Sequence, residues 1–254
     1  MPRLERGARP VETTAELPTG EAMAFQALLV FASADLLFLN KPRGMLVHGP
    51  DSLETMVREE LAVRRAASLA FVPGPLHRLD RNTSGLVTFP NSAEGGRVFS
   101  KLIRERRVRK RYIALLRGRL SEKEDWTDLI ERDRDRHVSE IRASGASARS
   151  WATPLTRSSG LTLALVEIGT GVTHQIRVQA GSRGFPLAGD SKYGGESFPG
   201  GYILHAQSLE FAEPPFPDLP RRIVAPLPTD AFERLARIFG CAETERALQE
   251  ALEA

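Results

Sequence analysis

The sequence predicts an α+β protein built on a mostly antiparallel, mixed β-sheet with flanking helices. Many short apolar runs are separated by turns that contain Gly and Pro, a pattern typical of strands. Only a few segments have helical spacing, and strands and helices do not alternate regularly, which indicates an α+β protein with a mostly antiparallel sheet. With 254 residues, 41% of them hydrophobic, the chain is long enough to bury a sizeable core.

The chain divides into three segments by composition. Residues 1–23 are polar and lack the apolar stretch of a signal peptide, so we expect a flexible leader there. Residues 24–240 carry the patterns of a folded domain, and the acidic residues 241–254 are predicted to form a helical tail. No apolar run reaches the roughly 18 residues that a membrane span needs. The single cysteine, Cys241, excludes an internal disulfide and suits a reducing cytoplasm.

The first half of the domain is predicted to contain strands and two helices. Residues 35–49 are predicted to form two short strands around a Lys-Pro-Arg-Gly turn, because Pro and Gly separate two apolar runs. The apolar spacing in residues 51–67 predicts a helix. A continuous apolar strand is expected at Gly85–Phe89 and a helix after it, with Asn91 as N-cap and Glu94 at the capping-box position.

The second half is richer in strands. The charged segment 121–147 has no clean period, and we expect an irregular excursion there. Asp230–Phe239 has apolar residues at helical spacing and is predicted to be a helix. The remaining predicted elements are strands at residues 111–120, 148–157, 161–169 and 202–211, and a short helix that begins near His174.

The sequence lacks the usual signatures of a bound cofactor or metal. Its five histidines are scattered, and one cysteine cannot build a zinc cluster. It has neither a P-loop nor the Gly-rich dinucleotide fingerprint. We therefore expect neither a cofactor nor a metal.

Two segments place polar groups where the pattern predicts interior positions. In HRLDRNTSGL, Asp80 stands between two arginines in a loop that leads into a buried strand. In GTGVTHQIRVQA, Thr173, His174 and Arg177 lie at the start of a helix. Taken singly, the first is explained by a turn-capping aspartate. The second is explained by an N-cap followed by a surface arginine.

Together, these segments resemble the RluA-type pseudouridine synthases. The catalytic motif of that family, H-R-L-D-x-x-T-S-G-L, matches His77–Leu86 at each defined position. Five further motifs of the family occur in the expected order between about Asp35 and Pro228. They are L-N-K-P-x-G with a following V-H (Leu39–Gly44, Val47–His48), K-x-Y (Lys110, Tyr112), T-G-x-T-H-Q-I-R (Thr170–Arg177), G-D-x-x-Y-G (Gly189–Gly194) and L-H-A-x-x-L (Leu204–Leu209).

The chain departs from the family pattern at a few positions. Val172 stands where the family usually has a basic residue, and Gln179 replaces a common histidine. Pro90 and Asn91 replace the usual Ala-Lys pair. None of these departures removes a residue of the expected catalytic set, and they could mark a different RNA contact surface.

The resemblance implies a catalytic domain over residues 24–240, with a central cleft and three catalytic residues. Asp80 is expected to be the essential carboxylate and Arg177 its ion partner. Tyr112 is expected to stack on the flipped base, although without the resemblance it would be taken for a core tyrosine. The residues expected to bind the RNA or to shape its site are Arg78, Arg81, Thr83, His77, His174, Arg104 and Arg107.

These roles follow the reaction that the family catalyses. The bond from the uracil nitrogen to the ribose breaks, the ring turns, and a carbon–carbon bond forms. Asp80 would add to the uracil ring, attack the anomeric carbon or remove a sugar proton, and the sequence leaves these routes open. Arg78 resembles the arginine that fills the space left by the flipped base. His77 and His174 are expected to orient their loops, with proton transfer as the less favoured role.

A basic strip precedes the strand that carries Tyr112. Lys101–Arg111 contains seven basic residues and one acidic residue, the usual footprint of a phosphate-binding surface. Charge alone fits a solvated helix face equally well. The prediction is that Arg104, Arg106 and Arg107 contact phosphates that flank the target.

The sequence thus predicts an RNA pseudouridine synthase that acts on structured RNA, either ribosomal or transfer RNA. We expect a cytoplasmic monomer without a membrane, metal or cofactor. One alternative is a catalytically inactive RNA chaperone of the same fold, which the intact Asp80, Tyr112 and Arg177 argue against. The other is a carboxylate-based RNA or nucleoside hydrolase, which would release free uracil.

Overall fold

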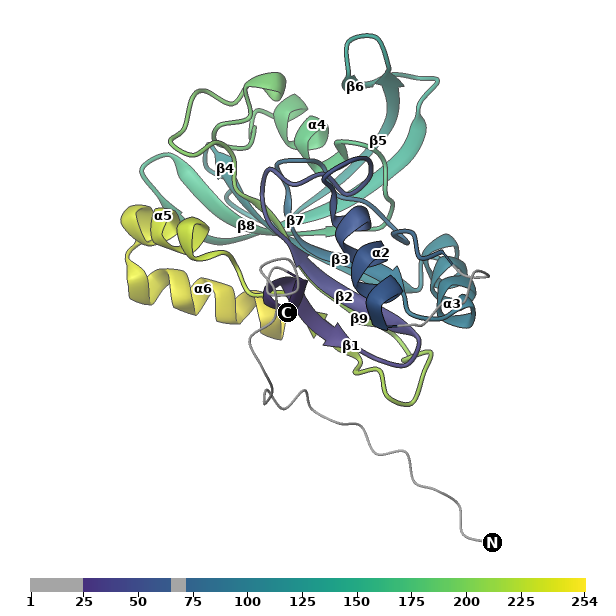
Figure 1. The fold of residues 1–254 in the computed structure, drawn as a ribbon. Helices are drawn as coiled ribbons and strands as arrows, with labels where there is room; N and C mark the ends of the chain where they lie inside the picture. Colours follow the sequence, from purple (N-terminus) through teal and green to yellow (C-terminus); the bar gives the residue numbers. More distant parts are fainter. Residues whose placement is uncertain (1–24, 65–71) are drawn as a thin grey trace, which may run out of the picture.

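A long mixed β-sheet forms the centre of the molecule (Figure 1), in a computed structural model that describes residues 25–64 and 72–254. The strand order is β1-β2-β3-β9-β4-β8-β7-β5-β6, with β10 paired to β9. Its strands are β1 (Leu29–Ala32), β2 (Leu36–Lys41), β3 (Ser84–Pro90), β4 (Val108–Arg117), β5 (Glu124–Asp133), β6 (Val138–Ile141), β7 (Ala146–Ser158), β8 (Leu161–Ile168), β9 (Leu204–Phe211) and β10 (Arg222–Val224). Among the described strands, only β3 and β9 pair in parallel, which confirms the predicted α+β class with a mostly antiparallel sheet.

Helices flank the sheet in groups. They are α2 (Leu53–Arg64), α3 (Ala93–Arg104), α4 (Gln175–Ser182), α5 (Thr229–Phe239) and α6 (Cys241–Glu253), with a short 3-10 turn, η1 (Ser191–Tyr193). Figure 1 shows α5 and α6 side by side at one end, α2 and α3 near the other, and α4 beside the β5–β6 hairpin. No helix in the described ranges is long and apolar enough to span a bilayer.

Alternate side chains of β2 supply two different cores. Leu37 and Leu39 pack with the apolar face of α2, whereas Leu36 and Phe38 pack with α3. Such a division follows from the two-residue period of a strand, which sends neighbouring side chains to opposite faces. Both faces of the sheet are therefore covered here, which explains why β3 is buried along its whole length.

The start of α3 differs from the prediction by one residue. Ser92, not Asn91, is the N-cap: its backbone is extended and its hydroxyl accepts a hydrogen bond from the Gly95 N–H at 2.9 Å. The Asn91 amide instead donates to the carbonyl of Ser33 at 2.7 Å. The Ser92 hydroxyl also donates to Asp35 Oδ1, so both residues tie the start of the helix to the turn between β1 and β2.

Two further sequence predictions are wrong. The second strand expected within residues 35–49 does not form. Instead, Lys41 Nζ donates hydrogen bonds to the carbonyls of Pro42 and Met45, at 2.9 Å each, and the chain turns around the ammonium group. The segment 121–147 is not irregular but contains the β5–β6 hairpin. Its fully inward apolar side chains, Trp126 and Ile130, lie four residues apart, too sparsely to be recognised as a strand.

The predicted leader and the predicted helical tail lie at the two ends of the chain. The leader at 1–23 and the last residues of the first predicted helix, 65–67, lie outside the described residues. At the other end, 241–254 contains α6, whose Ala247 and Ala251 are buried in the same cluster as Leu235 of α5. This tail therefore contributes to the core.

Candidate active site

The loop that carries Asp80 is fixed to two strands. The Thr83 N–H donates to the Asp80 carbonyl at 3.0 Å and closes a turn just before β3. Ser84 Oγ and His205 Nδ1 lie 2.9 Å apart across to β9. At Gly85, where φ is 111°, a Cβ would lie 2.3 Å from the Ala206 carbonyl oxygen, so only glycine permits this approach. The result is a rigid loop that leaves the Asp80 side chain 18% exposed.

Arg177 of α4 joins Asp80 to a second carboxylate. Its Nη1 donates to Asp80 Oδ2 at 3.1 Å, while Nε and Nη2 donate to the two oxygens of Asp190 at 2.7 and 2.8 Å. The rings of Tyr193 and Tyr202 lie 5.0 and 4.9 Å from the guanidinium carbon. Burial lowers the pKa of Arg177, but its carboxylate partners outweigh this and raise the pKa above its ordinary value. The guanidinium is thus a permanently charged, immobile fork.

His174 approaches the same oxygen of Asp80 that Arg177 contacts. It precedes α4 in a left-handed conformation, with φ at 58°, and its Nε2 is 3.7 Å from Asp80 Oδ2. Its Nδ1 lies 2.5 Å from the Tyr193 hydroxyl, which also accepts a hydrogen bond from the Ser139 N–H. Burial lowers the pKa of His174 to about 4, although Asp80 opposes the shift. The ring is therefore neutral at pH 7.

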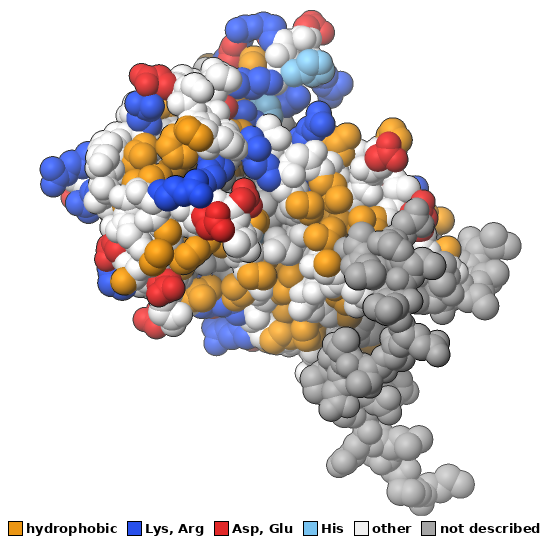
Figure 2. Space-filling model, turned by 60° about the vertical axis from the view of Figure 1, so that its left-hand side comes forward, with side chains coloured by type: hydrophobic (Ala, Val, Ile, Leu, Met, Phe, Trp, Pro, Cys, Tyr) orange, Lys and Arg blue, Asp and Glu red, His pale blue; other side chains and the backbone are white. Residues whose placement is uncertain are grey.

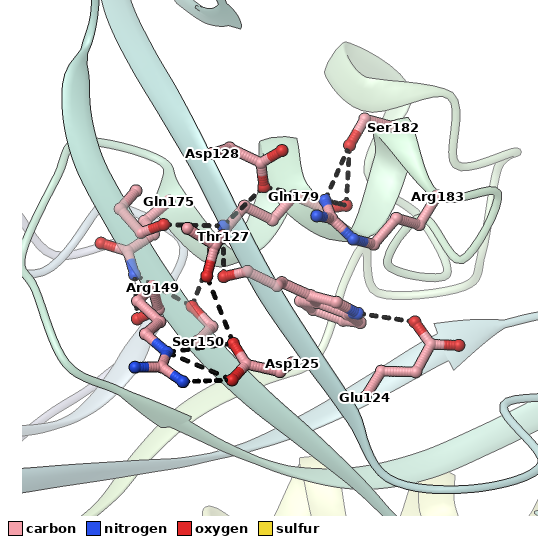
Figure 3. A network of polar contacts seen from close by, with 12 residues as sticks. Glu124, Asp125, Thr127, Asp128, Arg149, Ser150, Gln175, Gln179, Ser182 and Arg183 are labelled. Atoms are coloured by element: carbon pink, nitrogen blue, oxygen red, sulfur yellow. Dashed lines mark hydrogen bonds and ion pairs between the residues drawn. The ribbon is translucent and has the colours of Figure 1, made fainter.

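Beneath α4, a buried polar network fixes the helix to the sheet (Figure 3). The Gln179 amide nitrogen donates to the Trp126 carbonyl at 3.0 Å and to Asp128 at 2.7 Å, and its oxygen accepts from Ser150 at 2.7 Å. One turn earlier, the Gln175 nitrogen donates to Ser150 Oγ at 2.9 Å. These contacts tie α4 to β5 and β7, and they fix the origin of the Arg177 side chain.

Asp80 faces an inner pocket of about 180 Å³, lined also by His77, Lys110, Tyr112 and Leu204. Burial and the Asp80 charge raise the pKa of Tyr112, so its hydroxyl stays protonated. Burial lowers the pKa of Lys110. Burial and the Lys110 charge lower the pKa of His77 to about 3, so that ring is uncharged at pH 7.

Lys41 supports the floor of the site from inside. Its ammonium is fully buried and donates to the carbonyls of Pro42, Met45 and Arg81 at 2.9, 2.9 and 3.1 Å. Burial lowers its pKa to about 8, although Asp80 opposes the shift. Because its three donors are used, Lys41 holds two loops together and does not reach a substrate.

An outer pocket of about 410 Å³ opens on the other side of Asp80 and is lined by Arg43, Arg78, Arg81, Arg132 and Lys192. In Figure 2, Lys and Arg side chains gather in the upper part of the view, at the height where Figure 1 places α4 and the β5–β6 hairpin. Arg78 lines both pockets. The site thus combines a small pocket beside Asp80 with a larger basic one.

Some predicted site residues lie elsewhere. Thr83 is 2% exposed and lines neither pocket, and its N–H closes the turn of Asp80. His77 does line the inner pocket, where its Nε2 accepts from the Thr88 N–H at 3.1 Å. Arg104 ends α3 and Arg107 follows it, and both lie outside the two pockets.

Sequence reasoning assigned no role to several residues that build the site. Asp190 and Tyr202 hold Arg177, and Lys110 lines the inner pocket. The Gly-Asp motif was a usable signal for Asp190, but nothing in the local sequence links it to Arg177, 13 residues earlier. In the described ranges, no group of three or more His, Cys, Asp or Glu residues is placed to hold a metal.

Known proteins share this sequence pattern and this fold. Residues 35–182 match the family described as RNA pseudouridylate synthase. "Uncharacterized RNA pseudouridine synthase YlyB" of Bacillus subtilis is 32% identical over 89% of this chain and 79% of its own. "Ribosomal large subunit pseudouridine synthase D" of Xylella fastidiosa is 32% identical over 83% of this chain and 69% of its own. "Human RNA Pseudouridylate Synthase Domain Containing 4" shares the fold, with a TM-score of 0.69 at 20% identity over 90% of this chain and 95% of its own.

The fold, the site and these matches define the class as RNA-modifying isomerases. The chain belongs to the RNA pseudouridylate synthase family, within its RluA-type branch, and is an RNA pseudouridine synthase.

Proposed function

We propose that this enzyme isomerises specific uridines in structured RNA and that Asp80 is its essential carboxylate. One observation carries the assignment. Arg177 and His174 approach Asp80 through Oδ2, and in the described part of the chain no hydrogen bond reaches Oδ1. One oxygen is therefore held by the protein while the other remains available, at the wall of the inner pocket.

The step conserves atoms and needs no water. The bond between C1′ and N1 breaks, the uracil turns, C1′ bonds to C5, and the proton lost from C5 is balanced by one gained at N1. An ionised carboxylate serves each possible route, as nucleophile or as base. Arg177 compensates its charge from 3.1 Å, and Tyr112 provides a buried aromatic ring for the extruded base.

The second carboxylate of the site argues against a hydrolase. Glycosidases generally use two carboxyl groups, one as acid and the other as base or nucleophile. Both oxygens of Asp190 accept hydrogen bonds from Arg177, and the residue is 2% exposed. Asp190 is therefore unable to activate a water molecule, and Asp80 is left as the single working carboxylate.

We also propose the RNA substrate, the location and the oligomeric state of the enzyme. Relatives named as ribosomal large subunit pseudouridine synthases favour ribosomal RNA as the first substrate to test, with transfer RNA second. We place the enzyme in the cytoplasm, where such RNA is available, and take the monomer as its working form.

A matched pair of variants tests the role of Asp80. Pseudouridines are mapped in RNA from cells that lack the gene and carry wild type, Asp80→Asn or Asp230→Asn. Asp230 is an exposed carboxylate on α5 and serves as the control. Asp80→Asn should fold and bind RNA but form no product, because an amide is neither nucleophile nor base. Pseudouridine made by purified Asp80→Asn would refute the assignment, and release of free uracil by wild type would favour a hydrolase.

A further inference from the structure

A large groove lies beside the inner pocket, at the ends of the central strands. Its volume is about 690 Å³, and strands β4, β5, β7, β8 and β9 all contribute to its lining. Five arginines line it, against two glutamates: Arg106, Arg107, Arg109, Arg149 and Arg221, with Glu167 and Glu210. We refer to this feature as the arginine groove.

Buried charge beneath the groove reduces the effect of its glutamates. Arg111 is 4% exposed and lies 3.3 Å from Glu167 and 3.6 Å from Glu210. Arg109 reaches Glu167 only at 3.6 Å and Arg221 reaches Glu210 only at 4.0 Å, and both arginines are more than half exposed. These loose, exposed pairs are weak. Their guanidinium groups can therefore turn toward an incoming anion, and the groove is a positive surface.

One end of the groove offers a flat stacking platform. The guanidinium carbon of Arg149 lies 4.8 Å from the centre of the Trp151 ring. Asp125 fixes the edge of the same guanidinium through bonds from Nε and Nη2, and Figure 3 shows the two side chains facing each other. The Arg149 side chain is nevertheless 53% exposed. Nucleic-acid bases stack on such a planar, fixed guanidinium.

The groove adjoins the inner pocket across one short turn, residues 169–171. A Cβ on Gly169 would lie 3.3 Å from the Trp151 ring, and one on Gly171 would lie 3.5 Å from Lys110 Nζ. Ile168 lines both the groove and the inner pocket. A strand of RNA that leaves the inner pocket over this turn therefore reaches the arginine groove directly.

We propose that the arginine groove is a second RNA-binding site, which holds the single-stranded segment next to the target uridine. Arg106, Arg109 and Arg221 contact its phosphates, and one of its bases stacks on Arg149 above Trp151. The inference rests on the proposed function, because the segment that it places is continuous with the uridine in the inner pocket.

Tryptophan fluorescence tests the stacking directly. The chain has two tryptophans, and Trp126 is fully buried with its indole N–H bonded to Glu124. Titration of wild type with a single-stranded oligouridylate should quench the emission of Trp151, and Trp151→Phe should show no such change. Arg149→Gln should lose most of the quenching. Anisotropy of the labelled oligonucleotide reports binding independently, so binding without any change in emission would overturn the proposal.

Salt dependence tests the phosphate contacts. Each contact to a single strand contributes about 0.7 to the slope of log affinity against log salt, so Arg106→Gln/Arg109→Gln/Arg221→Gln should lower the slope by about 2. A control with the same change in charge replaces three exposed arginines elsewhere: Arg58→Gln/Arg97→Gln/Arg237→Gln. An equal slope in the two triple variants would refute the arginine groove as an RNA-binding site. Quenching by polyglutamate as strong as that by oligouridylate would assign it to an acidic protein instead.

Pseudouridine formation by wild type is measured separately, on RNA from cells that lack the gene. An active enzyme whose groove variants bind and quench like wild type would refute the groove and leave the proposed function intact. A wild type that shows quenching but forms no pseudouridine would refute the function.

Discussion

Asp190→Asn is the perturbation that tests most directly how the site is held. The carboxylate accepts two short charged hydrogen bonds from Arg177, and both side chains are buried. An amide in its place keeps the shape but turns an N–H₂ group toward one of the guanidinium donors. Removing one partner of a buried ion pair typically costs about 3–5 kcal/mol, because the other charge stays behind unpaired.

The consequence for the reaction follows from the geometry. Once Asp190 no longer fixes Nε and Nη2, the guanidinium is free to rotate away from its 3.1 Å contact with Asp80. We expect the single-turnover rate to fall at least tenfold, equivalent to about 1.4 kcal/mol in the barrier, while affinity for RNA changes little. Unfolding in urea and single-turnover kinetics at saturating RNA measure the two effects.

A second variant separates stability from positioning. Arg177→Gln/Asp190→Asn removes both charges, so it should recover most of the lost unfolding free energy yet remain inactive. An ordinary surface substitution changes the unfolding free energy by no more than about 0.5 kcal/mol. If the unfolding free energy of Asp190→Asn differs from that of wild type by no more than this, the buried ion pair does not stabilise the fold as we expect.

Three further predictions concern neighbouring groups. Arg177→Ala should slow turnover far more than it weakens binding, and Arg177→Lys should restore only part of the rate, because an ammonium lacks the planar fork; a normal single-turnover rate for Arg177→Ala would contradict this. Tyr112→Phe keeps the ring and should retain near-normal turnover, whereas Tyr112→Ala should lose rate but still bind RNA; equal losses of rate and affinity would indicate general packing. Burial lowers the folded-state pKa of His77 to about 3 and of His174 to about 4. The unfolded chain therefore binds protons that the folded protein does not, and the unfolding free energy should fall as pH drops from about 6.5 toward 4. Urea unfolding of wild type and His77→Gln at pH 7 and 5 checks this.

The sequence pattern predicts the main polar groups of the site. The loop before β3 and the start of α4 were singled out from sequence because they place charge next to apolar runs. The structure brings Asp80 and Arg177 into contact across 97 positions. The sequence could not predict that Asp190 takes two of the three guanidinium contacts, because this depends on where η1 packs against α4.

The predictions for residues 35–49 and 121–147 are wrong for the same reason. Local pattern reports which residues are apolar, but not which backbone groups a side chain will satisfy. Lys41 is fully buried, and its three carbonyl contacts take the place of the expected strand pairing. The β5–β6 hairpin forms by antiparallel pairing of two largely polar strands. Such strands contain no apolar run that the sequence pattern could reveal.

The helix α4 shows why the site itself is harder to predict than the fold. A surface helix has one apolar stripe, and a helix buried all round is normally apolar throughout. Here six consecutive residues from Gln175 to Ala180 are buried, and three of them are polar. Gln175 and Gln179 bond to β5 and β7, and Arg177 bonds to the loops that carry Asp80 and Asp190, so the burial is stable only in the assembled protein. The Gln179 amide both accepts and donates without titrating. The anchorage of Arg177 through Gln179 should therefore be independent of pH, in contrast to that of a chain with histidine at this position.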